Sequence, residues 1–265
     1  MKSACRFLEV LVLSLVLVGM SGAARAAEAD VGDEAEQLRG ILNNIMEDNA
    51  AFVKGHKPAY YKPFADQQHP RATVVTCSDS RVQMQALDKT PDGDLFVVRN
   101  IGNQISTAEG SVEYGVHHLH TPLLIIVGHV ACGAIKAAQG DYSKESGAIK
   151  RELSTIKLPP KNPKNDDDEE WLQGVTANVN NQVAFAMKKF EPEIKEGKLA
   201  VIGSIYDFRN TMHQGQGRLN IININGSTDS GSIMAGLMNM TRSGGMRLDK
   251  KPADNVPIEQ KPAVH

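Results

Sequence analysis

Short runs of apolar and β-branched residues recur along the chain, and segments with helical patterns lie between them. The runs cover residues 72–76, 95–98, 123–127, 199–205 and 219–224. Runs of this length and composition are typical of buried strands. Helices are expected over residues 34–54, 111–119, 134–139 and 175–190. Strands that alternate with helices predict an α/β fold with a mostly parallel central sheet flanked by helices.

Composition and patterning favour one domain. Of the 265 residues, 41 % are hydrophobic and 23 % are charged, as in ordinary globular proteins. No internal repeat or central linker is visible, so a single domain over residues 27–243 is expected. The prolyl and acidic segment 159–170 is expected to be a solvated loop, and residues 244–265 a mobile tail. The formal net charge of −2 gives no basic field that would gather nucleic acid.

The first residues have the features of a secretory signal peptide. Lys2 and Arg6 precede or border the apolar run 7–20, and Ala-Arg-Ala at 24–26 offers the small residues that signal peptidases require. Cleavage after residue 26 would make residues 1–26 a signal peptide and export the protein to a periplasm or out of the cell. An uncleaved membrane anchor is the alternative, although the run is shorter than the ~20 residues that a span needs. No stable membrane span is expected after cleavage.

Two cysteines stay in the mature chain, Cys77 and Cys132, because Cys5 lies in the predicted signal peptide. His129 lies three residues before Cys132, and both strands that precede these residues should end at the same edge of the sheet. Two sulfurs and one imidazole suit zinc, and three protein ligands leave an open position, as in catalytic zinc sites. A Cys77–Cys132 disulfide and two buried structural thiols are the alternatives at this point.

Asp79 and Arg81 follow Cys77 closely. At spacing i, i+2 on a turn, a carboxylate and a guanidinium can pair through two hydrogen bonds. Such a pair would keep Asp79 ionised and aim one of its oxygens, either at a water on the metal or at the metal itself. A loop salt bridge of little energetic value is the alternative.

Four motifs together resemble the β-class carbonic anhydrases. They are CSDSR at 77–81, LFVVRNIGN at 95–103, SVEYGVHHL at 111–119 and GHVACGAIKA at 128–137. Their order and spacing are those of the family, and the resemblance covers residues 36–225. It implies a lyase, carbonate dehydratase, in which a zinc-bound hydroxide attacks carbon dioxide and yields bicarbonate and a proton.

The resemblance also implies roles for individual residues. It assigns one Zn²⁺ per chain to Cys77, His129 and Cys132. It makes Asp79 and Arg81 a catalytic dyad that orients the hydroxide, with Asp79 as a possible fourth metal ligand in an inactive form.

Four further residues are implied to contact substrate: Gln68, Phe96, Tyr114 and Gly133. Gln68 matches the glutamine that hydrogen-bonds substrate in the plant-like branch of the family, and Phe96 and Tyr114 match pocket aromatics of that branch. A surface glutamine and plain core packing are the alternatives. Val74 stands where the bicarbonate-gated branch usually has a tryptophan, so the resemblance implies the ungated branch.

The resemblance further implies a homodimer or a higher homo-oligomer with the cleft at the subunit interface. Its small-molecule partner would be carbon dioxide or bicarbonate. Two other functions stay open. One is hydrolysis of a carbon dioxide analogue, such as carbon disulfide or carbonyl sulfide, because function resides in the pocket. The other is a non-enzymatic zinc-binding or redox protein.

Overall fold

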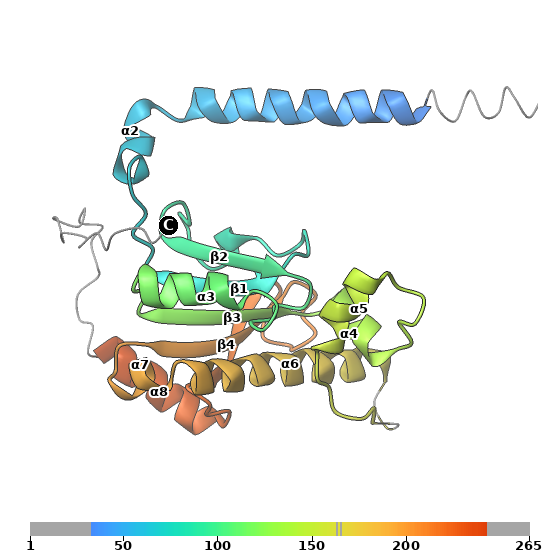
Figure 1. Ribbon diagram of the computed structural model, residues 1–265, viewed down its shortest axis with the longest axis vertical. Coiled ribbons are helices and arrows are strands. Elements are labelled where there is room, and N and C mark those ends of the chain that lie inside the picture. Colours follow the sequence, from blue (N-terminus) through green and yellow to red (C-terminus); the bar gives the residue numbers. More distant parts are fainter. Residues whose placement is uncertain (1–32, 163, 165, 243–265) are drawn as a thin grey trace, which may run out of the picture. The chain divides into compact units, whose positions relative to one another are not determined.

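The computed structural model describes residues 33–162, 164 and 166–242 (Figure 1). The described residues fall into two compact units, the first ending at Pro63 and the second beginning at Phe64. The predicted signal peptide, 1–26, and the predicted tail, 244–265, lie outside the described residues. Within the described ranges, no helix combines the length and the apolar character needed to cross a membrane.

The first unit is helical. A helix over residues 33–55 confirms the helix predicted over 34–54, and α2 (Pro58–Tyr61) and the short 3₁₀ helix η1 (Lys62–Phe64) follow it. The apolar side chains that gave the long helix its pattern are between 45 % and 71 % exposed in this chain: Leu38, Ile41, Leu42, Ile45, Met46, Phe52 and Val53. A helix gains most of its stability when such an apolar face is buried against another surface.

The second unit is built on one five-stranded sheet with the order β2-β1-β3-β4-β5. The strands are β1 (Ala72–Cys77), β2 (Leu95–Asn100), β3 (Leu123–His129), β4 (Ala200–Asp207) and β5 (Arg218–Ile224). Strands β1 to β4 pair in parallel, and β5 pairs with β4 antiparallel. Every predicted run is therefore a strand, and the predicted α/β fold with a mostly parallel sheet is confirmed.

Helices connect and cover the strands. They are η2 (Met84–Ala86), α3 (Glu109–Glu113), the π-helical η3 (Tyr114–His118), α4 (Gly133–Gln139), α5 (Gly147–Ser154), α6 (Asp167–Lys189), α7 (Glu191–Lys195) and α8 (Ser230–Arg242). Helix α6 runs alongside β4 (Figure 1) and packs on β3 and β4. It approaches them closely where the strands have glycine: a Cβ at Gly128 would lie 2.6 Å from Val179, and one at Gly203 would lie 2.8 Å from Val183.

The prediction of a loop over residues 159–170 is wrong in its acidic part. Asp166 is the N-cap of α6, where its carboxylate accepts a hydrogen bond from the backbone N–H of Glu169 at 2.8 Å. The Glu169 side chain reaches back to the backbone of Asp166, which completes a capping box. The acidic residues after Asp166 form the first turn, where negative charge stabilises the helix dipole. Helix α6 therefore begins well before the predicted residue 175.

The centre of the sheet brings two notable strand ends together. Strand β1 has β2 on one side and β3 on the other, so the strand order reverses between β1 and β3. Cys77 ends β1 and His129 ends β3. In open parallel sheets, ligands bind beyond the carboxyl ends of the strands at such a reversal.

Candidate metal centre

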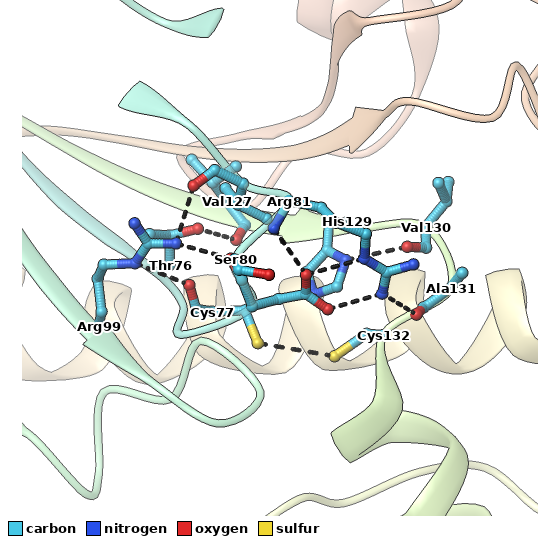
Figure 2. A network of polar contacts seen from close by, with 12 residues as sticks. Thr76, Cys77, Ser80, Arg81, Arg99, Val127, His129, Val130, Ala131 and Cys132 are labelled. Carbon is cyan, nitrogen blue, oxygen red and sulfur yellow. Dashed lines mark hydrogen bonds and ion pairs between the residues drawn. The ribbon is translucent and has the colours of Figure 1, made fainter. Parts of the chain in front are cut away.

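Cys77, His129 and Cys132 meet at this edge of the sheet. All three residues are buried, and their ligand atoms lie within 4.8 Å of one another. The two Sγ atoms face each other at 4.0 Å (Figure 2). Two sulfurs bound to one tetrahedral zinc at ~2.3 Å would be about 3.8 Å apart. A disulfide requires about 2.05 Å, and both cysteines are free, so the disulfide alternative is wrong.

The ring of His129 is oriented to offer one nitrogen to a metal. Its Nδ1 lies 2.9 Å from the carbonyl oxygen of Val130. A carbonyl oxygen only accepts, so Nδ1 carries the proton and Nε2 keeps a lone pair. Nε2 is buried and has no hydrogen-bond partner among the described residues. An unpartnered, buried imidazole nitrogen beside two sulfurs fits a metal ligand whose other nitrogen is fixed by a carbonyl.

The two thiols differ in their acidity. The hydrogen bond from Cys132 lowers the pKa of Cys77 well below its ordinary value, whereas that contact and burial raise the pKa of Cys132. Backbone N–H groups of Ala134 and Ile135, in the first turn of α4, also interact with the Cys132 sulfur and favour its thiolate. Thiolates are the form in which cysteine binds metals, so the surroundings are suited to a soft cation.

Asp79 and Arg81 form the predicted bidentate pair. The Arg81 side chain donates from Nε to Oδ1 at 2.9 Å and from one terminal nitrogen to Oδ2 at 2.7 Å. The backbone N–H of Arg81 donates to Oδ1 as well, at 2.9 Å. These hydrogen bonds hold the pKa of Asp79 well below its usual range. Because Asp79 Oδ2 is 3.8 Å from Nε2 of His129, the carboxylate borders the three candidate metal ligands.

The sequence assigns no role of its own to Arg99, which lies within the motif LFVVRNIGN at 95–103. In the structure its guanidinium donates to three backbone carbonyls, those of Cys77 at 3.0 Å, Asp79 at 2.9 Å and Val82 at 2.8 Å. Figure 2 shows Arg99 reaching from β2 to the segment that follows β1. Arg99 therefore fixes the backbone that carries both Cys77, a candidate metal ligand, and the Asp79 carboxylate.

The aromatic residues predicted to contact substrate lie elsewhere in the chain. The rings of Phe96 and Tyr114 are neighbours, with centroids 5.8 Å apart. Phe96 pairs with Thr73, near the start of β1, whereas Cys77 ends that strand. Four residues of strand span about 13 Å. Within one chain, the structure therefore does not bring Phe96 and Tyr114 to the three candidate metal ligands.

The other two predicted substrate contacts differ in their position. Gly133 is the first residue of α4 and directly follows the metal-ligating Cys132. Gln68 is exposed in the irregular segment before β1. Their contact with substrate stays a prediction.

Comparison with known proteins identifies the family. Residues 72–213, more than half of the chain, match the family described as carbonic anhydrase. The chain belongs to the carbonic anhydrase family. A carbonic anhydrase of Mycolicibacterium smegmatis is 33 % identical over 177 residues, which are 61 % of this chain and 85 % of that protein. Carbonic anhydrase 2 of Mycobacterium tuberculosis is 30 % identical over 182 residues, which are 61 % of this chain and 84 % of that protein.

A solved structure shows the same fold. A tetrameric β-carbonic anhydrase from Sordaria macrospora superimposes with a TM-score of 0.59 at 24 % identity, covering 69 % of this chain and 98 % of its own. The fold is thus that of β-class carbonic anhydrases, which confirms the resemblance. β-Class carbonic anhydrases are zinc-dependent lyases that hydrate carbon dioxide, and the three ligand side chains described above fit such a metal.

Proposed function

We propose that zinc is the metal held by Cys77, His129 and Cys132, and that the chain uses it to hydrate carbon dioxide reversibly. The observation that carries this proposal is the buried Nε2 of His129, which faces two sulfurs 4.0 Å apart and has no hydrogen-bond partner among the described residues. The set of two sulfurs and one nitrogen leaves a fourth position, as catalytic zinc sites require. A zinc ion there would act as a Lewis acid that makes water acidic enough to lose a proton near neutral pH.

The dyad of Asp79 and Arg81 orients the oxygen that attacks carbon dioxide. Asp79 is held ionised by Arg81, so at neutral pH its oxygens only accept hydrogen bonds. By accepting the O–H of the attacking oxygen, Asp79 leaves a lone pair of that oxygen free to form the new bond to carbon. One C–O double bond of carbon dioxide then becomes a single bond, and its electron pair moves to the oxygen of bicarbonate. The proton released from water leaves to buffer.

We propose that Gln68, Phe96 and Tyr114 act on the substrate of a neighbouring subunit, and that Gly133 acts within its own. The separation of Phe96 from Cys77 along β1 supports this assignment. An apolar ring suits carbon dioxide, which offers no strong polar group to bind.

A homodimer or higher homo-oligomer is part of the proposal. The exposed apolar side chains of helix 33–55 support a second copy of this chain as their partner, since a helix gains most of its stability by burying such a face. The Sordaria macrospora relative is a tetramer.

Export and the ungated branch complete the proposal. The charged, apolar and small-residue pattern of residues 1–26 supports a periplasmic or secreted enzyme. Val74, which is fully buried in β1, supports the ungated branch because it stands where the gated branch usually has a tryptophan.

A stopped-flow assay of carbon dioxide hydration tests the function. The purified protein should be active as isolated, inactive after chelation, and active again after one equivalent of zinc is added per chain. Carbonyl sulfide and carbon disulfide serve as competing substrates in the same assay. Faster turnover of either one than of carbon dioxide, or no effect of chelation, would contradict the proposal.

A further inference from the structure

Three consecutive carbonyl groups in the segment 130–132 each accept a hydrogen bond from a side chain. Val130 accepts from Nδ1 of His129 at 2.9 Å, and Ala131 accepts from Arg81 at 3.0 Å. Cys132 accepts from Nε1 of Trp171 at 2.7 Å. The first two donors belong to the predicted ligands and dyad, whereas Trp171 lies in α6 and has no assigned role.

This segment needs such support because its backbone is strained. Ala131 has a φ of +55°, in the left-handed region that residues with a Cβ adopt at a cost. On one side the strand holds it, since the backbone N–H of Val130 donates to the carbonyl of Tyr206 at 3.1 Å. On the other side the side-chain donor is Trp171. Without that bond, the carbonyl of Cys132 keeps only its hydrogen bond from the backbone N–H of Lys136, and a small rotation of the 131–132 backbone that relieves the strain would also turn the Cys132 sulfur.

The ring of Trp171 packs against α4. The ammonium group of Lys136 in α4 lies 4.8 Å from the centroid of its ring, a cation–π contact. Gly174, one turn later in α6, lets α4 pack closely, because a Cβ there would lie 2.8 Å from Ile135. The indole N–H is therefore presented at a fixed position.

We propose that Trp171 is a positioning residue of the metal centre, which sets the orientation of Cys132 through the carbonyl of that residue. The inference rests on the proposed metal-binding function. It concerns orientation rather than folding, because the carbonyl of Cys132 also accepts from the backbone N–H of Lys136 at 3.1 Å. Loss of the indole donor therefore leaves no buried acceptor without a partner.

The variant Trp171→Phe removes the donor and keeps an aromatic ring beneath Lys136. We expect it to release zinc to a chelator on the order of 10-fold faster than the wild type, the lower end of the usual effect of groups that orient metal ligands. In the cobalt-substituted protein, the thiolate-to-cobalt absorption should shift, because the direction of one Co–S bond changes. The melting temperature of the metal-free protein should change by only a few degrees.

Gln139→Met is the matched control. It removes the hydrogen bond that the Gln139 side chain in α4 donates to the backbone carbonyl of Glu170 in α6 at 2.9 Å. The bond from Trp171 to the carbonyl of Cys132 stays in place. Its melting temperature should fall about as much as that of Trp171→Phe, while its zinc release and cobalt spectrum should equal those of the wild type. If both variants change zinc release equally, Trp171 has only a structural role and the inference is wrong.

Lys136→Met tests the same inference without altering Trp171, and its exposed side chain makes misfolding a minor concern. The chain has a single tryptophan, so its fluorescence reports Trp171 alone. Addition of zinc to the metal-free wild type should change the fluorescence of Trp171. Lys136→Met should release zinc two- to three-fold faster than the wild type, because a weak cation–π contact is lost. If metal-loaded Trp171→Phe and Lys136→Met both release zinc at the rate of the wild type, this inference is wrong, whereas the proposed function is unaffected. A wild-type protein that binds neither zinc nor cobalt would overturn the proposed function as well.

Discussion

Arg81 holds both carboxylate oxygens of Asp79, through hydrogen bonds of 2.9 Å to Oδ1 and 2.7 Å to Oδ2. The same guanidinium donates to the carbonyl of Ala131, between the ligands His129 and Cys132. It also lies over the ring of Phe208, with its central carbon 4.7 Å from the ring centroid. Arg81 thus connects the carboxylate to the segment that carries His129 and Cys132, two of the proposed metal ligands, and Asp79 has little freedom to turn.

Asp79→Asn should abolish most of the activity and leave the metal in place. The substitution puts an amide donor where the mechanism requires an acceptor, while Cys77, His129 and Cys132 are unchanged. We expect kcat/KM to fall by a factor on the order of 10² or more, the usual contribution of a positioned acid–base group. Zinc content and stopped-flow kinetics measure the two effects separately. An Asp79→Asn enzyme of nearly full activity would contradict the mechanism.

Arg81→Ala should lower activity by a different route. Without the guanidinium, the pKa of Asp79 returns towards its ordinary value near ~4, so Asp79 is still ionised at pH 7. The carboxylate is then free to swing onto the metal as a fourth ligand. The double variant should therefore be much less impaired than the product of the two single effects, because residues that act as a unit are not additive. Kinetics of all four proteins at equal zinc occupancy give the coupling, and strictly multiplicative losses would argue against it.

The pKa of Asp79 also predicts how stability depends on pH. Since folding lowers this pKa, the Asp79–Arg81 pair stabilises the fold above about pH 4 and loses that effect as the pH falls through the lowered pKa. The contribution is at most about 1 kcal/mol because Arg81 is half exposed. Urea unfolding of metal-free wild type and Asp79→Asn should show a constant difference in the free energy of unfolding from pH 5 to 8. The difference should shrink below pH 4, and a difference that grows there would contradict the assignment.

The strands of the sheet could be predicted because each one is a short run of apolar or β-branched residues. Residues 72–76 and 123–127 are uninterrupted apolar or β-branched runs, which suit strands covered on both faces. The antiparallel direction of β5 (Arg218–Ile224) was not predictable, because direction depends on the connection rather than on composition. The start of α6 was misjudged because charge suggested a loop, although Asp166 and Glu169 have the spacing of a capping box.

The parts of the site that depend on side-chain chemistry could be predicted from the sequence. Cysteine and histidine are common ligands of zinc and other soft metals, so their residue types alone indicate a metal site. Asp79 and Arg81 are two residues apart, so their pairing could be predicted from the sequence. The roles of Arg99 and Trp171 could not be predicted from the sequence. Both side chains donate hydrogen bonds to backbone carbonyls, and every residue has a backbone carbonyl, so no residue type indicates the acceptor. Arg99 bonds to carbonyls up to 22 residues away, and Trp171 to one 39 residues away. Only the packing of β2 and α6 brings these donors there.

The ungated branch predicts a particular response to acid. With Val74 in place of the tryptophan of the gated branch, activity should decline gradually below pH 8 and bicarbonate should not act as a cooperative inhibitor. Initial rates of carbon dioxide hydration from pH 6 to 9, with and without added bicarbonate at constant ionic strength, measure this. A steep cooperative loss below about pH 8 that bicarbonate strengthens would assign the chain to the gated branch instead.

The central claim is that Cys77, His129 and Cys132 hold the zinc on which catalysis depends. The most direct measurement is the zinc content of wild type and Cys77→Ser, determined by mass spectrometry of the native proteins alongside the hydration rate of the same samples. The account predicts one zinc per wild-type chain, and joint loss of zinc and activity in Cys77→Ser, because a serine hydroxyl is a poor ligand at neutral pH. A metal-free wild type that is active, or an active wild type with a Cys77–Cys132 disulfide, would contradict it.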